Sequence, residues 1–426
     1  MARGARLSFA ALFFAVPGCS LLVDTDVGVR ADGGGLDGGS GRAECGTIGR
    51  LQDEFTGSVL APVWLTQQQG AHVDVAAPVG GKLRIGFHAG VLAGDTDYSV
   101  AFTQLAYDLR GDSIAVRMDA VDSAWRSSLA VGEPGANRPQ IGIGTEGSSL
   151  IGWTLDPPTD RVVLESRRYD PATDLYWRIR ESGGAVELET AGEAGGFVRF
   201  ARVEDPAFPL DNVYAALPVV SGGASDQDGA IEYDQLNQDA VATPACPIAE
   251  LTDSFDPPVP GPLWVDRSTG CAFQMGDETL LGTAEPGLLC ELVSAKAYSI
   301  EAGGSLAVEI VEFPSAAGNS FTLRLEDLEG DQVWVRRRDG VLRAELDIRD
   351  STVDDFEMAT IVPAGWWRLR ESGGDLVVET APDGIDWDPL TTFDPSGAID
   401  LAEVRAVLEI EAAAEPASAE LGGVNP

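Results

Sequence analysis

The stretch that decides the fold occurs twice in the chain. Residues 176–190 read YWRIRESGGAVELET, and residues 366–380 read WWRLRESGGDLVVET. In each copy an alternating run of aromatic or apolar and charged residues leads into a Gly-Gly pair, and a second alternating run follows. This pattern is typical of a β-hairpin. Because strand side chains alternate between two faces, Trp177 is predicted to point into a core and Arg178 outward.

The repetition extends beyond the hairpin, which indicates a duplicated β domain. An opening Asp-x-Phe followed by Pro-x-Trp, at Asp53 to Trp64, recurs 200 residues later at Asp253 to Trp264. Between these anchors lie short alternating or apolar runs bounded by Gly, Pro and Asp, and no long stripe with helix caps. We predict strands at 82–87, 113–118, 140–144, 150–155, 161–166, 305–311, 321–325, 332–337 and 342–346.

Many short strands at regular spacing predict an all-β chain with two tandem antiparallel β-sandwich (jelly-roll) domains. We place them at residues 45–245 and 246–426. The chain is long enough for each domain to form a core of its own.

These repeated residues resemble the concanavalin A-like lectin/glucanase sandwich, and within it the laminin G-like and related bacterial modules. The motifs that carry the resemblance are Asp-x-Phe, Pro-x-Trp, Trp-x-Arg-x-Arg-x-x-Gly-Gly and the Glu-Thr strand. The resemblance covers each repeat nearly end to end and implies two facing antiparallel sheets, with one concave face. It implies no single activity, because the superfamily contains lectins, hydrolases and adhesion modules.

The N-terminus has the pattern of an export signal. Arg3 and Arg6 precede an apolar run from Leu7 to Val16, which is too short to span a bilayer. The run ends in Val-Pro-Gly-Cys19, which resembles the lipobox of bacterial lipoproteins, although Pro17 is atypical there. The resemblance implies a signal peptide at 1–18 and a diacylated Cys19 at the start of the mature protein. The alternative is an ordinary secretory signal with an incidental cysteine.

Residues 19–44 are rich in Gly and Asp, so we predict a flexible tether. Ser20 follows the cysteine, which in the resembled family favours passage to the outer membrane. The expected location is therefore the outer membrane or cell surface of a Gram-negative bacterium, reached through the lipid anchor. The net charge of −39 argues against a nucleic-acid partner.

Four cysteines remain after Cys19, and an exported chain is expected to pair them. Cys45 and Cys246 stand just before the two domains, so we predict that they pair and clasp the first domain at its ends. Cys271 and Cys290 would then pair across an early hairpin of the second domain. Four cysteines allow three connectivities, and free thiols are a further alternative.

Enzymatic signals are sparse. Glycoside hydrolases need paired carboxylates, and the nearest candidates are Glu187-x-Glu189 and Glu345-x-Asp347. The first pair is not repeated intact, and we found no third carboxylate for the second. No Gly-x-Ser-x-Gly elbow occurs. We therefore expect a protein without catalytic residues.

Metal signals are equally weak. The only two histidines, His72 and His88, do not indicate a zinc site, and His72 is interpreted as a packed or edge residue of a strand. We expect no cofactor. Calcium is an alternative, because acidic loops supply its ligands, although so acidic a chain has such pairs by chance. The pairs in question are Asp95 with Asp97 and Asp226 with Asp228.

Aromatic side chains on a sheet suit sugars, which stack their apolar faces on such rings. Trp177 and Trp367 are interpreted as core residues, and the arginines of the hairpins as partners of strand carboxylates or of a ligand. The candidate ligand-binding residues are Trp153, Tyr176, Arg178, Trp334, Trp366 and Arg368.

Together these patterns predict a surface-anchored, non-catalytic binding or adhesion lipoprotein that recognises an extracellular glycan or protein partner. The alternatives are a structural envelope lipoprotein without a small ligand and a divergent glycoside hydrolase.

Overall fold

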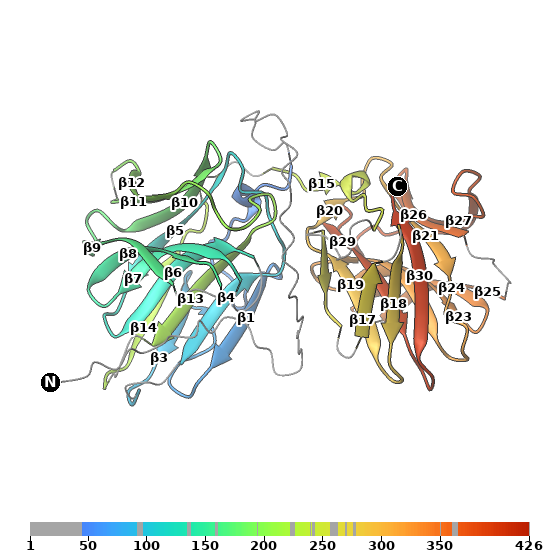
Figure 1. The fold of residues 1–426 in the computed structure, drawn as a ribbon, viewed down its shortest axis with the longest axis horizontal. Helices are drawn as coiled ribbons and strands as arrows, with labels where there is room; N and C mark the ends of the chain where they lie inside the picture. Colours follow the sequence, from blue (N-terminus) through green and yellow to red (C-terminus); the bar gives the residue numbers. More distant parts are fainter. Residues whose placement is uncertain are drawn as a thin grey trace. The chain divides into compact units, whose positions relative to one another are not determined.

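The structure is a computed structural model. It describes residues 45–91, 97–133, 138–157, 161–193, 195–221, 226–238, 240, 243–255, 263–268, 271–275, 278–349, 351–359 and 365–425. The predicted signal peptide, the tether and Cys19 lie outside these residues. The chain divides between Thr243 and Pro244 into two compact units, which we call unit 1 and unit 2 (Figure 1). No helix of the described part is long and apolar enough to cross a membrane.

The described residues of unit 1 form two sheets of seven strands. The first sheet has the order β1 (Trp64–Gln69), β4 (Tyr98–Thr103), β13 (Tyr214–Ser221), β6 (Trp125–Gly132), β7 (Gln140–Glu146), β8 (Ser149–Leu155) and β9 (Val162–Arg168). The second has the order β12 (Val198–Val203), β11 (Ala185–Ala191), β10 (Tyr176–Ser182), β5 (Ser113–Ala120), β14 (Gly229–Asp234), β3 (Leu83–Phe87) and β2 (Ala77–Pro78).

Unit 2 also has two sheets. The first runs β15 (Cys246–Pro247), β20 (Tyr298–Ser299), β29 (Val404–Glu411), β22 (Ser320–Asp327), β23 (Gln332–Arg338), β24 (Val341–Ile348) and β25 (Ser351–Ala359), with β19 (Leu289–Ser294) beside β29 and β16 (Trp264–Asp266) beside β19. The second runs β17 (Cys271–Met275), β18 (Leu280–Ala284), β30 (Ala417–Val424), β21 (Ser305–Glu312), β26 (Gly365–Ser372), β27 (Asp375–Ala381) and β28 (Asp388–Phe393).

The strand orders of the two units correspond. The order β12-β11-β10-β5-β14-β3 of unit 1 matches β28-β27-β26-β21-β30-β18 of unit 2, and β13-β6-β7-β8-β9 matches β29-β22-β23-β24-β25. Among the described strands the long ones pair antiparallel, and the two-residue β15 pairs parallel with β20. The prediction of an all-β chain with antiparallel sandwiches is confirmed.

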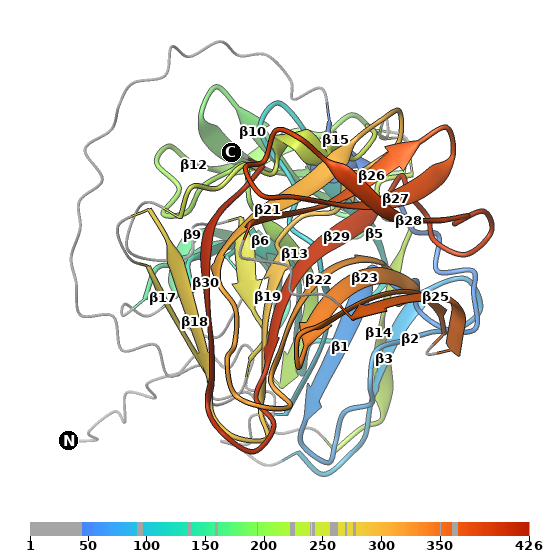
Figure 2. The same ribbon diagram turned by 90° about the vertical axis from the view of Figure 1, so that its right-hand side faces the viewer.

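The repeated stretch forms the predicted hairpin in both units. Trp177 pairs with Thr190 between β10 and β11, and Trp367 pairs with Thr380 between β26 and β27. Figure 2 shows β26 and β27 side by side. Both tryptophans are buried, as alternation predicts. In unit 2 the ring of Trp367 lies 5.2 Å from Phe313 and 5.5 Å from Phe321, centroid to centroid, in the core between the sheets.

The repeated Asp-x-Phe and Pro-x-Trp motifs have a structural role. The Asp53 carboxylate accepts hydrogen bonds from the Phe55 backbone N–H at 2.6 Å and from Trp64 Nε1 at 2.9 Å. The equivalent bonds of Asp253 are 2.8 and 2.9 Å. One carboxylate therefore ties the turn after a short 3-10 helix to β1 in unit 1 and to β16 in unit 2. These helices are η1 (Ile48–Arg50) and η2 (Ile248–Glu250).

The disulfide of unit 2 differs from its predicted setting. Cys271 and Cys290 are bonded, with their Cα atoms 5.7 Å apart. They do not span one hairpin, because Cys271 belongs to β17 and Cys290 to β19, which lie in different sheets. The bond therefore joins the two layers of the sandwich. Cys45 and Cys246 are also disulfide-bonded, and their mutual pairing stays a prediction.

Candidate binding site around the repeated hairpin

The outward face of each hairpin places an arginine over an aromatic ring. The guanidinium carbon of Arg178 lies 3.9 Å from the ring centroid of Phe197, and that of Arg368 lies 3.9 Å from Trp387. A cation at this distance is attracted by the negative face of the ring. Neither ring was predicted from the sequence, although Phe197 and Trp387 are separated by the same 190 residues as the hairpins.

The hairpin arginines are held by buried carboxylates. Arg178 Nε donates to Glu189 at 2.6 Å, and Arg368 Nε donates to Glu379 at 2.6 Å. Burial acts to raise the pKa of Glu379, but hydrogen bonds from Arg370 and Arg368 outweigh burial and lower it. Glu379 is therefore a charged partner of its arginines. Both glutamates fix the direction of the arginine that they bind.

Tyr176 and Arg178 line a cavity of about 340 Å³, which we call the Tyr176 cavity. The Tyr176 hydroxyl donates to Gln235 at 3.5 Å, and burial raises the pKa of this hydroxyl. Phe197 and Gln238 complete a wall that combines aromatic carbon with amide, hydroxyl and guanidinium groups.

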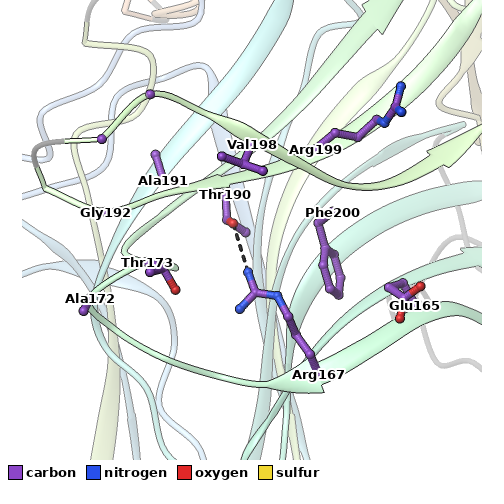
Figure 3. Close-up of a pocket in the computed structure, with 12 residues that line it drawn as sticks. Glu165, Arg167, Ala172, Thr173, Thr190, Ala191, Gly192, Val198, Arg199 and Phe200 are labelled. Carbon is purple, nitrogen blue, oxygen red and sulfur yellow. Dashed lines mark hydrogen bonds between the residues drawn. The ribbon is translucent and has the colours of Figure 1, made fainter.

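A second and larger cavity, of about 680 Å³, lies between the edge strands β9 and β12; we call it the Arg167 cavity. Figure 3 shows the guanidinium of Arg167 turned toward Thr190, with the ring of Phe200 beside it. Arg167 donates to both oxygens of Asp174, at 2.7 and 2.5 Å, and this carboxylate is fully buried. A planar guanidinium held by a two-point contact stays in one orientation at the cavity wall.

The two cavities adjoin. Both are lined by Ala191, Gly192 and Gly195, which belong to the end of β11 and to its connection with β12. The connection separates the two spaces, so one ligand that crosses it can contact both. The candidate site of unit 1 is therefore the surface on both sides of this connection.

Exposed apolar side chains lie on both edge strands beside the Arg167 cavity, and one of them, Val198, also lines it. Val162, Val163 and Leu164 of β9 and Val198 of β12 are exposed. In unit 2 the corresponding edge strand, β25, carries Asp354, Asp355 and Glu357 instead. Charged residues protect an edge strand from unwanted pairing, whereas exposed apolar residues on an edge are typical of a contact surface.

Trp153 and Trp334 do not form an exposed aromatic row. Only 4% of the Trp153 surface and 6% of the Trp334 surface are exposed to solvent. Trp153 lies against Gly142 of the neighbouring strand, where a Cβ atom would stand 2.4 Å from the indole ring. Trp334 donates from Nε1 to Asp347 at 2.7 Å. Trp366 is half-buried and packs on Gly384.

One member of each acidic pair considered for calcium accepts a backbone N–H. The Asp97 carboxylate accepts the His72 backbone N–H at 3.1 Å, and Asp228 accepts the Ala89 N–H at 2.7 Å. Asp95 lies outside the described residues. Asp226 is described but exposed.

The outward face of the first sheet differs strongly between the units. A cross-strand row of Ala216, Ala130, Gly142 and Trp153 in unit 1 corresponds to Val407, Arg324, Trp334 and Glu345 in unit 2.

The charges on this face of unit 2 are buried or half-buried and are paired with opposite charges. Arg324 Nη donates to Glu409 at 3.0 Å and to Glu291 at 2.5 Å. Burial raises the pKa of Glu409, although Arg324 and Arg336 oppose the shift, and burial lowers the pKa of Arg405 to about 10. The face is an ion-pair network that the sequence analysis did not predict.

No protein-family model matches the chain, and no curated protein matches it. Solved structures that resemble part of it include the laminarinase catalytic domain from Thermotoga petrophila RKU-1, at 10% identity over 44% of this chain and 94% of that one (TM-score 0.32). The laminarinase from Flavobacterium sp. UMI-01 is 13% identical over 44% and 97% (TM-score 0.33). The GH16 endo-β-1,3(4)-glucanase SCLam is 13% identical over 44% and 88% (TM-score 0.34). Similarity at this level says nothing about activity.

Proposed function

We propose that this chain is a non-catalytic glycan-binding protein and that unit 1 binds the glycan at the Tyr176 cavity. The observation that carries the proposal is the wall of this cavity, where the Arg178–Phe197 stack stands beside Tyr176 and two glutamine side chains. Sugars present an apolar face and a rim of hydroxyl groups, so they need aromatic carbon and hydrogen-bonding groups together.

The fixed geometry of the cavity supports the proposal. Arg178 is held by its hydrogen bond to Glu189 and by its stacking on Phe197. The side chain therefore loses little rotamer entropy when its remaining N–H groups bind a hydroxyl group. The adjoining Arg167 cavity would extend the site to further residues of an oligosaccharide. A volume of about 340 Å³ lies within the range of about 300–1,000 Å³ that is typical of ligand pockets.

The proposed location is the outer surface of a bacterial cell. A lipid on Cys19 and a tether through residue 44 would hold both units near the membrane while leaving unit 1 free to meet a polymer. The lipobox resemblance and the composition of the tether support this part of the proposal.

Replacing either Phe197 or Tyr176 by alanine is expected to weaken glycan binding about tenfold, because each ring contributes a stacking free energy of roughly 1–1.5 kcal/mol. A thermal-shift screen of polysaccharides identifies the ligand, and isothermal titration then measures its affinity. Val353→Ala, an exposed apolar truncation in β25, is the control and is expected to bind normally. A glycan bound equally well by both site variants would place the site elsewhere.

Glycoside hydrolysis is the second candidate function. Glu345 and Asp347 lie two residues apart on one face of β24, and both are buried. The Asp347 carboxylate accepts the Trp334 N–H, and Glu345 accepts the Thr352 hydroxyl at 3.2 Å. A pair of carboxylates is the minimum that a glycosidase requires.

The binding proposal predicts no release of reducing ends from the bound polysaccharide. Prolonged incubation followed by a reducing-end assay checks this expectation. Release that disappears in Glu345→Gln would establish hydrolysis at β24 and overturn the non-catalytic proposal. Release that persists in the variant would come from other residues or from a contaminant, which repurification distinguishes.

A further inference from the structure

The only two histidines of the chain lie opposite each other at the end of a sheet in unit 1. Val73 bridges Phe87 of β3, and the His88 backbone N–H donates to the His72 carbonyl at 2.9 Å. Val73 and Phe87 are buried, so alternation directs His72 and His88 to the outward face. Side chains directly opposite in an antiparallel pair have Cβ atoms about 4.5–5.5 Å apart.

Two carboxylates flank this histidine pair. Asp74 lies two residues beyond His72, and its Oδ1 is 3.0 Å from His88 Nε2. Asp228 stands next to Gly229, which pairs with Phe87, and therefore lies beside His88 on the other side. Four side chains that carry nitrogen or oxygen atoms able to bind a metal thus point outward from three neighbouring segments.

Two glycines leave room for these side chains. A Cβ atom at Gly86 would lie 2.2 Å from Asp74 Oδ2, so only glycine leaves space for the carboxylate in this position. Gly90 has a φ of +109°, and a Cβ atom there would lie 3.1 Å from His72 Cε1.

We infer that His72, His88 and Asp74 form a surface site for a divalent transition-metal ion, Zn²⁺ or Cu²⁺. Imidazole nitrogen is a preferred ligand of both ions. Bonds of about 2.0–2.1 Å at a tetrahedral angle separate two ligand atoms by roughly 3.3 Å. The observed 3.0 Å between His88 Nε2 and Asp74 Oδ1 is close to this separation.

The half-buried His72 supplies the second nitrogen once its side chain rotates toward His88 and Asp74, and water completes the coordination. The net charge of −39 raises the local concentration of any cation near the surface. An exposed His–Asp pair adds little to folding stability, so these side chains can be replaced without unfolding the unit.

Electron paramagnetic resonance of the chain with one equivalent of Cu²⁺ tests the site, using protein purified without a histidine tag. We expect hyperfine coupling from two imidazole nitrogens, falling to one in His72→Ala and in His88→Ala. The chain has no other histidine, so the double variant His72→Ala/His88→Ala contains no imidazole and serves as the negative control.

Zn²⁺ titration by calorimetry gives an independent readout. Affinity is expected to fall more than tenfold in each histidine variant and in Asp74→Ala. Asp386→Ala, an exposed carboxylate of unit 2, is the control and should bind Zn²⁺ normally. Copper spectra without imidazole coupling, or Zn²⁺ affinity unchanged in both histidine variants, would overturn the inference and assign binding to the acidic surface alone.

Discussion

Replacing Trp367 by alanine is expected to lower the free energy of unfolding of unit 2 by about 3–5 kcal/mol. The indole is only 1% exposed and packs against both Phe313 and Phe321 in the core of the sandwich. Its removal loses the transfer free energy of the ring and leaves a cavity that the two sheets, already packed through neighbouring side chains, cannot close.

The adjacent residue supplies a matched control. Trp366 stands on the same strand with its side chain on the outward face and is only half-buried. Trp366→Ala is expected to cost about 1–2 kcal/mol, since less apolar area is lost and water fills the space. Urea unfolding of both variants measures the difference. Equal losses would contradict the assignment of Trp367 to the core.

Replacing Asn237 by alanine is expected to destabilise unit 1 by about 3–4 kcal/mol. The Asn237 amide donates to the carbonyls of Ile48 and Leu51 at 3.0 and 2.9 Å and accepts the Ala115 N–H at 2.7 Å. Its backbone has a φ of 51°, which costs alanine about 1 kcal/mol more than glycine. Alanine therefore loses three hydrogen bonds and adds strain.

Asn237→Gly separates the two contributions, because glycine accepts the positive φ and still removes the side chain. We expect a loss about 1 kcal/mol smaller than that of alanine. Asn425 makes the same three bonds in unit 2, to Ile248, Leu251 and Ala307, so the pair of variants can be repeated there. A glycine variant as stable as the unaltered chain would show that the hydrogen bonds contribute nothing.

Local signals made much of the fold predictable. The Gly-Gly turn and strict alternation specify the hairpin and the burial of Trp177, because both depend on neighbours along the chain. The predicted strands at 113–118, 140–144 and 332–337 correspond to β5, β7 and β23.

Contacts between distant strands could not be predicted. Trp153 lies on the face of β8 that points away from the core between the sheets, and yet it is buried. The reason is that its cross-strand neighbour Gly142 has no side chain, which leaves room for the indole. The Asn237 clasp spans almost the whole of unit 1 and has no local pattern. The stacking of Arg178 on Phe197 depends on how the β11–β12 connection folds back over β10.

Hydrogen–deuterium exchange of the chain with and without its polysaccharide tests the central claim most directly, because it locates the contact without any substitution. We expect slower exchange in residues 176–178, 191–200 and 235–238, the segments around the two cavities of unit 1. Exchange in β25 of unit 2 should stay the same. Protection confined to other strands, or none with any polysaccharide of the panel, would contradict glycan binding at the Tyr176 cavity.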